Sequence, residues 1–396
     1  MANILKDPRR LPSLMATAAV IVIALVWLGP LVASSAPNRL LQSAITGLLV
    51  GGIYSLIALG IVVINKASGV FNFAHGGMMM VTGFIFFSFF TSSNVSLPFA
   101  VIFSTVTVLL AVTMLGWREL LRQPRLMVIG LLAIAALAFV ISLPGTDFKW
   151  LRGIVGASMG AALLGLTVER FTIRPLIGQP LFASVMMTLA VAQIFNGTTQ
   201  LLWGSQPQAL LIFAETNPIG LEVKVSPIRI DATELLGGNI SIDRARLYAF
   251  GLALVAFLAF WVFFRYTSVG LAMRATSENQ MLAQSVGLRV RMILAVAWGI
   301  AALLAGTAGV LHGGAASLDT NMQLLALRAF PAVLLGGIES IGGALIGGLA
   351  IGLTEEYSKL LFSGDVGEQL APYVVLMVVL VFRPEGLFGQ KRIDRI

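Results

Sequence analysis

Apolar residues along this chain come in blocks of about the length that a membrane-spanning helix needs, separated by short polar segments. Beyond the first, these blocks span 40–64, 70–90, 97–117, 126–143, 153–169, 181–203, 247–264, 292–312, 323–337, 341–358 and 370–382. Most are long enough to cross the hydrocarbon core of a bilayer as α-helices. The pattern predicts an all-α fold, a polytopic transmembrane helical bundle that forms a single domain over residues 1–396.

Two consecutive blocks near the C-terminus, 323–337 and 341–358, are short and interrupted by glycine. Gly336-Gly337 ends the first block and Gly342-Gly343 begins the second. Non-helical backbone at membrane depth is tolerated where protein covers it or where it lines a cavity. We therefore expect a re-entrant or hairpin pair of broken helices, with Pro331 as the first residue of a helix.

The first apolar block, 14–33, is preceded by Lys6, Arg9 and Arg10 and followed by Ala33-Ser34-Ser35-Ala36. A basic start, an apolar run and small residues also describe a cleaved secretory signal. The run is long for such a signal and long enough to span a membrane. We expect a retained, extra N-terminal helix, and a cleaved signal is the alternative.

Composition agrees with the membrane class. Hydrophobic residues make up 58% of the chain and charged residues 11%, and the mean hydropathy is +0.93. A soluble protein has about a quarter charged residues. The net charge of +8 does not indicate nucleic-acid binding, because the basic residues are scattered between apolar blocks. The sequence has no cysteine, which excludes disulfides, thiolate metal sites and cysteine nucleophiles.

The distribution of lysine and arginine predicts an orientation. A cytoplasmic N-terminus, with the glycine-broken pair entering and leaving from the outer face, places most of the 26 basic residues inside. Both termini are then cytoplasmic, 265–291 is the largest cytoplasmic loop, and 204–246 is the largest periplasmic loop. Within the latter, Leu221–Ile230 alternates like a short β-ribbon. The outer side receives Arg39, Lys149, Arg152, Lys224, Arg229, Arg244, Arg246 and Lys359, and Arg328 is left at the membrane.

No constellation for catalysis is visible in the sequence. It contains neither a phosphate-binding Gly-x-x-x-x-Gly-Lys-Ser/Thr loop nor a His-Glu-x-x-His motif, and its two histidines, His75 and His312, stand apart in apolar surroundings. We expect no catalytic residue, no metal site and no cofactor. Any ATP that drives this protein must be hydrolysed by another chain.

The cytoplasmic loop 265–291 has the features of a short docking helix. Ser277 is a typical N-cap residue, Glu278 would lie in the first turn, and Gly287 is a typical C-terminal stop. Such a helix would carry on one side Met281, Leu282 and Ser285. A polar helix of this length suits a groove on a soluble partner, or it is an ordinary amphipathic connector.

The same loop carries a family resemblance. It reads Gly270-Leu-Ala-Met-Arg-Ala, then Glu278-Asn279, then Ala283 and Gly287. This resembles the coupling loop in permeases of bacterial branched-chain amino acid ATP-binding-cassette importers. In that family the loop inserts into the ATPase subunit and transmits its closure to the membrane helices. The resemblance implies that the ATPase-coupling positions are Arg274, Glu278, Asn279, Ala283 and Gly287.

Two further strings are similar to signatures of that family. Asn72-Phe-Ala-His75-Gly76-Gly77 resembles its Asn-Phe-Ala-His-Gly string, although the family usually has glutamate where Gly77 stands. Asn72 is either a structural cap or the start of a broken helix whose free N–H groups face an anion.

The second string, from Leu327 to Ala344, resembles the family's glycine-rich C-terminal signature, and Glu355-Glu356 closes the next block. The likeness between 70–90 and 327–350 predicts a weak internal repeat. Intramembrane ionisable residues usually have a function, although Arg328 and Glu339 also fit interface positions. We predict a translocation pathway lined by Asn72, His75, Gly76, Gly77, Arg328, Gly336, Gly337 and Glu339.

The resemblance also implies partners and a location. The partners are a second related permease subunit in a heterodimer, two ATP-binding-cassette ATPase subunits, a periplasmic solute-binding protein and the bilayer of a bacterial inner membrane. The cargo is a branched-chain or other amino acid, with urea or a short amide as the alternative within the family. From other classes, an ion-coupled secondary transporter and a structural or channel subunit stay open.

Overall fold

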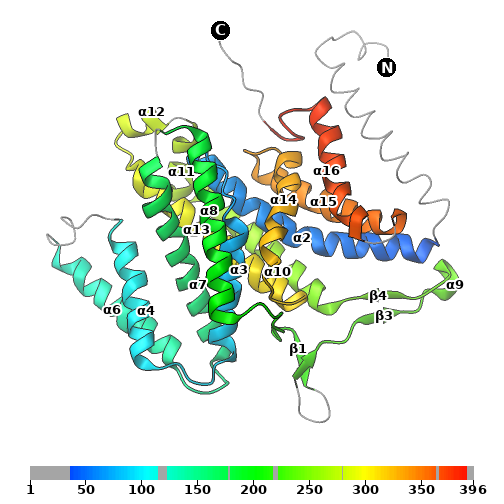
Figure 1. Ribbon diagram of the computed structural model, residues 1–396, viewed down its shortest axis with the longest axis horizontal. Coiled ribbons are helices and arrows are strands. Elements are labelled where there is room, and N and C mark those ends of the chain that lie inside the picture. Colours follow the sequence, from blue (N-terminus) through cyan, green and yellow to red (C-terminus); the bar gives the residue numbers. More distant parts are fainter. Residues whose placement is uncertain are drawn as a thin grey trace, which may run out of the picture. The chain divides into compact units, whose positions relative to one another are not determined.

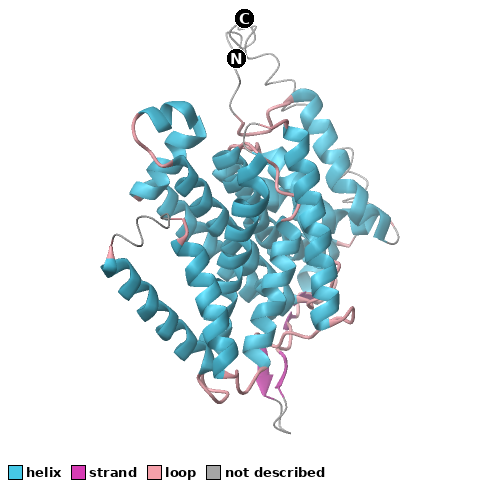
Figure 2. Ribbon diagram, turned by 60° about the vertical axis from the view of Figure 1, so that its left-hand side comes forward, coloured by secondary structure: helices cyan, strands magenta, loops and turns pink. Residues whose placement is uncertain are grey.

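The computed structural model describes residues 36–114, 123–176, 179–216, 222–278, 280–362 and 365–389 (Figure 1). Helices dominate these residues, and the named strands are confined to the segment between residues 214 and 242 (Figure 2). The predicted all-α membrane fold is confirmed. The first apolar block, 14–33, lies outside the described residues.

The apolar helices follow the predicted blocks closely, because each block contains enough apolar residues to satisfy its backbone as a helix in lipid. They are α2 (Pro37–Ser68), α3 (His75–Thr91), α4 (Leu97–Val112), α6 (Pro124–Ser142), α7 (Lys149–Thr167), α8 (Leu181–Trp203), α10 (Arg244–Tyr266), α13 (Val290–Ala315), α14 (Met322–Gly336), α15 (Ile341–Leu361) and α16 (Asp365–Phe382). A π-helical turn η1 (Val168–Ile173) and a 3-10 turn η2 (Arg174–Leu176) continue α7.

The loop elements are shorter. Within the predicted periplasmic loop lie β1 (Ala214–Thr216), β2 (Glu222–Lys224), β3 (Ile228–Ile230), α9 (Thr233–Leu236) and β4 (Ile240–Ile242). Strand β1 pairs with β2 and β3 pairs with β4, both antiparallel. Strands therefore occur within Leu221–Ile230 as expected, but each of them pairs with a segment outside that stretch. The predicted cytoplasmic loop contains α11 (Ser268–Glu278) and α12 (Gln280–Ser285).

Among the described residues, five helices are long and apolar enough to cross a membrane: α2, α6, α7 with its continuation, α10 and α13. Helix α6 presents apolar side chains almost all round, since only 11% of its most apolar window is buried. Val128, Leu131 and Phe139 are among its exposed residues. A surface of this kind is stable in lipid and not in water.

The chain divides into two compact units, each built from segments distant in sequence. Unit 1 comprises the described residues of 1–58, 213–254 and 328–396, and unit 2 comprises Leu59–Ile212 and Val255–Leu327. Helices α2, α10 and α14 each contribute residues to both units.

Unit 2 is centred on α3, α7 and α13, which pack against one another, while α8 contacts α3 and the α4–α6 pair contacts α7. Small residues let these backbones approach closely. A methyl group on Gly165 of α7, for example, would lie 2.6 Å from the Trp298 carbonyl oxygen of α13.

Unit 1 contains about the first two thirds of α2, the second part of α14, and α15 and α16. Helices α2 and α15 touch through glycine, because a methyl group on Gly51 would lie 2.8 Å from the Leu349 Cα. The Ser55 hydroxyl donates to the carbonyls of Gly51 and Leu345, at 2.8 and 2.9 Å, which fixes this contact.

The glycine-broken pair consists of a helix of 15 residues, α14, and one of 21 residues, α15. At 1.5 Å per residue α14 is about 22 Å long and too short to span the bilayer alone, as expected of a broken helix. Pro331 does not begin this helix. It lies inside α14, which begins nine residues earlier at Met322. The predicted internal repeat stays a prediction.

Candidate functional site

The segment 265–291 folds into two short helices, not one. Ser277 and Glu278 end α11, and α12 begins at Gln280. The predicted helix start at Ser277 is therefore wrong, because α11 continues from Ser268 and buries Met273 and Thr276. Asn279, between the two helices, lies outside the described residues.

Arg274 holds α11 against the end of α10. Its Nη1 donates to the Phe264 carbonyl and its Nη2 to the Arg265 carbonyl at 3.3 Å, and its guanidinium lies 5.3 Å from the centre of the Phe264 ring. Those carbonyls belong to the last turn of α10, where the helix dipole favours a cation. Arg274 therefore fixes the angle between the membrane helix and the loop.

Ala283 and Gly287 define the shape of α12. Ala283 is buried, and the Leu288 N–H donates to its carbonyl at 3.0 Å. The Gly287 N–H donates to the Gln284 carbonyl at 3.0 Å, and Gly287 has a φ of +87°. This is a glycine-terminated helix end, in which a side chain would be strained.

Three large apolar side chains of this loop point away from the protein. The exposed fractions are 81% for Met281, 63% for Leu282 and 72% for Val286. We call these three residues the apolar tip. Glu278 is also exposed. The segment that forms α11 and α12 (Figure 1) thus combines internal residues that fix its shape with an apolar tip whose side chains are largely exposed.

The second predicted string surrounds the start of α3 and lies in unit 2. The Asn72 Oδ1 accepts the Ala74 N–H at 3.0 Å, and its Nδ2 contacts the Met78 sulfur at 3.7 Å. Asn72 therefore caps the turn that leads into α3, which begins at His75. Neither ring nitrogen of the fully buried His75 has a hydrogen-bond partner among the described residues.

Gly76 and Gly77 allow other elements to approach the start of α3. A methyl group on Gly76 would overlap the Gln323 carbonyl oxygen, and one on Gly77 would lie 2.9 Å from the Phe195 ring. The second contact leaves little room for a side chain at position 77. Phe195 of α8 occupies the space that a longer side chain would need.

A chain of amide side chains next to this point was not predicted. The Asn196 Nδ2 donates to the Gln323 Oε1 at 2.9 Å, and the Gln200 Nε2 donates to the Asn196 Oδ1 at 2.5 Å. Asn196 and Gln200 are four residues apart and so share a face of α8. In the sequence, this four-residue spacing of two amide side chains was the one indication of a polar face on α8. The partner from α14 was not foreseeable, because Gln323 is more than 120 residues away in the sequence.

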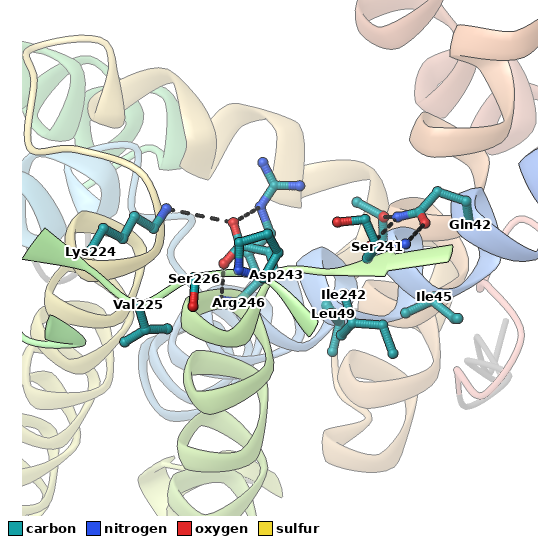
Figure 3. Close-up of a pocket in the computed structure, with 12 residues that line it drawn as sticks. Gln42, Ile45, Leu49, Lys224, Val225, Ser226, Ser241, Ile242, Asp243 and Arg246 are labelled. Atoms are coloured by element: carbon teal, nitrogen blue, oxygen red, sulfur yellow. Dashed lines mark hydrogen bonds and ion pairs between the residues drawn. The ribbon is translucent and has the colours of Figure 1, made fainter. Parts of the chain in front are cut away.

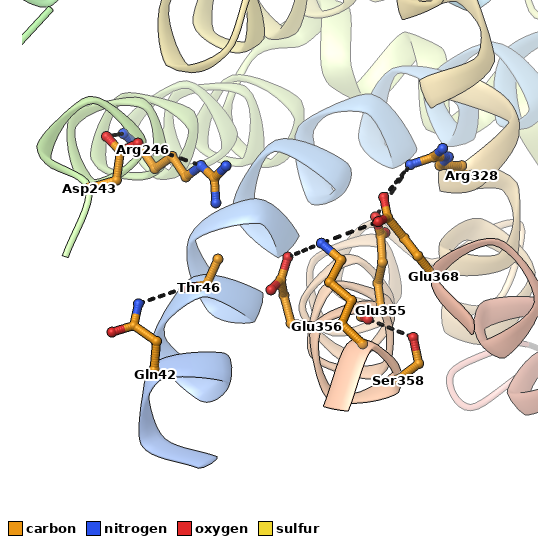
Figure 4. Close-up of polar contacts among 10 residues, drawn as sticks. Gln42, Thr46, Asp243, Arg246, Arg328, Glu355, Glu356, Ser358 and Glu368 are labelled. Carbon is orange, nitrogen blue, oxygen red and sulfur yellow. Dashed lines mark hydrogen bonds and ion pairs between the residues drawn. The ribbon is translucent and has the colours of Figure 1, made fainter. Parts of the chain in front are cut away.

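The third predicted string contributes a charged network in unit 1 (Figure 4). The Arg328 Nη1 lies 2.7 Å from the Glu368 Oε1 and 3.5 Å from the Glu355 Oε1. The Lys359 Nζ lies 2.6 Å from the Glu356 Oε1 and 3.4 Å from the Glu368 Oε2. The second carboxylate oxygen of Glu355 is buried without a hydrogen-bond partner among the described residues.

The remaining predicted pathway residues have packing roles. Gly336 packs on the backbone of Gly343, and Gly337 has a φ of +100°. Residues 387 and 388 donate their N–H groups to the carbonyls of Leu335 and Gly336 at 2.8 and 3.1 Å, so the C-terminal segment is anchored here. Glu339 lies half-buried in the turn between α14 and α15. The predicted pathway residues thus divide between the units, and within unit 2 the structure brings together Asn72, His75, Gly76 and Gly77.

Arg152 is the second feature that was not predicted. Counted from sequence as an outer-interface charge, it is fully buried. Its guanidinium donates to four backbone carbonyls: Phe89 at 3.2 Å, Leu143 at 2.6 Å, Gly145 at 2.8 Å, and Ser92. Phe89 lies in the last turn of α3, Ser92 directly follows that helix, and Leu143 directly follows α6. One side chain thus joins two helix ends to the start of α7.

The long apolar helices, with side chains that are stable only in lipid, define an integral membrane protein. The chain belongs to the family described as "Branched-chain amino acid transport system / permease component", whose profile matches residues 43–383.

Individual relatives agree with this assignment. The chain is 25% identical over 361 residues to the Salmonella typhimurium protein "High-affinity branched-chain amino acid transport system permease protein LivH", covering 90% of this chain and 97% of that one. It is 27% identical over 358 residues to the corresponding protein BraD of Pseudomonas aeruginosa, covering 90% and 98%. A probable LivH of Methanocaldococcus jannaschii is 31% identical over 130 residues, 31% of this chain and 41% of that protein. No solved structure matches the chain significantly.

Proposed function

We propose that this chain is the membrane-spanning permease subunit of an ATP-binding-cassette importer in a bacterial inner membrane. Its cargo is a branched-chain amino acid or another amino acid of similar chemistry. The observation that carries the proposal is the apolar tip of Met281, Leu282 and Val286 on a loop whose shape is internally fixed. An apolar surface of this kind on a polar segment fits a groove on a soluble partner.

The partners follow from this role. Two ATPase subunits hydrolyse ATP and receive the loop 265–291, a second related permease subunit completes a heterodimer, and a periplasmic binding protein delivers the cargo to 204–246. Both termini are cytoplasmic, and residues 1–396 act as a single transmembrane domain. Among the coupling positions, Arg274, Ala283 and Gly287 hold the loop in shape, while Glu278, Asn279 and the apolar tip meet the ATPase.

The cargo's path passes the start of α3. A broken helix offers N–H groups to a carboxylate, and Asn72, His75, Gly76 and Gly77 surround that point. The amides of Asn196, Gln200 and Gln323 add uncharged hydrogen-bonding groups beside it. Arg328, Gly336, Gly337 and Glu339 form the second part of the path.

Transport requires two states of the helix bundle. Binding of ATP draws the two ATPase subunits together, and their movement pushes on the apolar tip. Arg274 connects that loop rigidly to the end of α10, so the displacement reaches the membrane helices. The bundle then changes between inward-open and outward-open conformations.

Uptake by the reconstituted assembly tests the proposal. Vesicles containing this chain, the second permease and the ATPases, with the binding protein outside, should import leucine only when ATP is supplied inside. Import should persist when ionophores collapse the proton and sodium gradients. Loss of import with the ionophore would instead favour an ion-coupled secondary transporter, for which the charged network around Arg328 is the specific observation. Uptake of urea or acetamide in place of leucine would favour the short-amide alternative.

A further inference from the structure

Helix α8 carries a row of amide side chains along one face. Gln193, Asn196 and Gln200 follow one another at spacings of three and four residues, so they lie on the same side of the helix. Gln193 and Gln200 are exposed, and Asn196 is half-buried. A methyl group on Gly197, on the same side, would meet no atom of the described residues within 4 Å. We call Gln193, Asn196 and Gln200 the amide row.

The amide row extends from one end of α8 toward the middle of the bilayer. Helix α8 ends at Trp203, where the loop 204–246 begins. At 1.5 Å per residue, Gln200 lies about 4.5 Å and Gln193 about 15 Å from that end along the helix axis. The second distance is about half the thickness of the hydrocarbon core. The row is therefore a polar strip that leads from the loop to about the middle of the membrane.

A face of this kind does not suit lipid. Helix α6, which is largely exposed, has no polar side chain between Arg125 and Ser142. An amide in hydrocarbon loses its hydrogen bonds to water, and polar groups at membrane depth therefore face the bundle interior or a water-filled space. The contrast between α6 and α8 indicates that the amide row faces water or protein.

The amide row adjoins the start of α3. The Asn196 Nδ2 donates to the Gln323 Oε1 at 2.9 Å, and the Gln323 carbonyl oxygen lies where a methyl group on Gly76 would stand. At the end of α8, the Trp203 Nε1 donates to the Ser88 Oγ of α3 at 2.7 Å. Helix α8 is thus fixed against α3, and its amides are contiguous with the point where the proposed path passes.

The elements that meet at this point are almost free of ionisable residues. Helix α8 has none, and neither has the segment Met322–Leu327 of α14. In α3 the one ionisable residue is the buried His75. The hydrogen-bonding side chains next to the start of α3 are therefore neutral amides.

The cavity of unit 1 differs from the amide row in this respect. It has a volume of about 400 Å³, and Lys224, Asp243 and Arg246 are among the residues that line it (Figure 3). The Lys224 Nζ and the Arg246 Nε lie 3.5 and 3.8 Å from the Asp243 Oδ2, so these charges pair with one another. Charged groups thus occur at the loop 204–246, whereas α8 presents only neutral ones.

We propose that the amide row is a wall of the translocation passage and selects the cargo by charge. It binds the carboxylate and ammonium groups of an amino acid with an uncharged side chain, because each amide offers two N–H donors and an acceptor oxygen. A charged side chain would bring a net charge into the membrane with no counter-charge beside it. This inference rests on the proposed function, and it adds that lysine and aspartate are excluded at α8.

Single cysteines test whether water and cargo reach the amide row. The sequence has no cysteine, and a thiol reacts with a charged methanethiosulfonate where water allows the thiolate to form. In the permease–ATPase assembly without binding protein, Gln193→Cys and Gln200→Cys should react. Leucine at a concentration equal to its Kd should slow the reaction about twofold. Leu131→Cys, on the exposed surface of α6, is the control and should not react.

The same labelling measures selection by charge. Lysine and aspartate should protect Gln200→Cys at least about tenfold more weakly than leucine. Adding Asn196→Asp should make lysine protect at least about tenfold better, because the carboxylate supplies a counter-charge, and should leave aspartate excluded. Thr198→Asp is the matched control: it adds the same charge at a similar depth on another side of α8 and should leave lysine excluded. If Asn196→Asp does not assemble, Gln193→Glu gives the same comparison.

Three results would overturn the inference. Absence of reaction at both Gln193→Cys and Gln200→Cys would remove the row from the passage, and a disulfide from either position to a cysteine of the second permease would make it a subunit interface. Equal protection by leucine and lysine with the native amides would exclude selection by charge. In each case the proposed function stands if the complete assembly imports leucine with ATP. Absence of that import rejects the proposed function, whatever the labelling shows.

Discussion

At the scale of single residues, Arg152 is the clearest case of a charge whose role depends on its partners. A buried cation is costly unless its donors are satisfied. Here the carbonyls that remain unpaired at the ends of α3 and α6 supply the acceptors. No carboxylate contacts Arg152 among the described residues, so the carbonyl dipoles alone offset the charge.

Replacing Arg152 with methionine should therefore destabilise the protein strongly. The substitution leaves four carbonyls without their donor, and the expected loss is about 3 kcal/mol or more. The measurement is thermal unfolding in detergent. Arg125→Met removes an exposed arginine at the start of α6 and should change the midpoint little. Equal midpoints for both variants would contradict the role of Arg152 as a link between helix ends.

Gly77 gives a second prediction at this scale. Gly77→Glu should lower stability and transport, because its Cβ alone would lie 2.9 Å from the Phe195 ring. The double variant Gly77→Glu with Phe195→Ala should recover part of both, since the smaller side chain vacates that space. Thermal unfolding and leucine uptake are measured for the original chain, for Gly77→Glu and for the double variant. Full function in Gly77→Glu alone would show that Phe195 is not the obstacle.

At the scale of elements, α12 differs from the membrane helices because its exposed apolar side chains do not face lipid. The exposed apolar residues of α6 are compatible with lipid as solvent, whereas the apolar tip belongs to a segment too polar for the membrane. Exposure of such a tip to water is unfavourable, and the free energy falls when a partner covers it.

Met281→Asp and Leu282→Asp should each reduce ATP-driven uptake more than tenfold with thermal stability unchanged. A buried apolar anchor at an interface contributes about 2 kcal/mol or more, and a charge in its place adds a desolvation cost. Gln284→Asp, an exposed position of the same helix, is the matched control. Co-purification of the ATPases and uptake should fall together. Normal uptake in both tip variants would exclude this surface as the coupling contact.

The charged network links α14, α15 and α16, and a double-mutant cycle measures it. Arg328→Met should destabilise unit 1 by about 3 kcal/mol, because Glu355 and Glu368 lose the cation that they share. Adding Glu355→Gln should restore part of that loss, because one of the uncompensated carboxylates becomes neutral. Unfolding of the single and double variants gives the coupling. Purely additive effects would mean that Arg328 and Glu355 do not interact.

At the scale of the whole molecule, orientation decides which surfaces meet which partners. The sequence contains no cysteine, so single cysteines can be placed without background. Gln284→Cys should react with a membrane-impermeant maleimide only in inside-out vesicles, and Arg229→Cys only in right-side-out vesicles or cells. This follows from the excess of basic residues on the cytoplasmic side. The reverse labelling pattern would invert the topology and separate the apolar tip from any ATPase.

Much of the architecture was predictable from the sequence. The helix bounds of α8, α13 and α14 lie within a few residues of their apolar blocks, because in lipid the backbone must satisfy itself within the helix and apolar length sets the span. The predicted helix starts were wrong where tertiary packing outweighs the local preference of a residue. Ser277 is a good N-cap residue, yet α11 continues through it, and Pro331 lies inside α14, because packing of the surrounding chain decides where a helix ends.

The sequence alone determined the class of protein, the position of its helices and the family, since hydropathy and short motifs are local properties of the chain. Only the tertiary structure decided which groups are partners: Arg328 with Glu355 and Glu368, and Arg152 with the ends of α3 and α6. Most of these pairs are separated by tens of residues. Their contacts depend on how the helices pack, which no local pattern encodes.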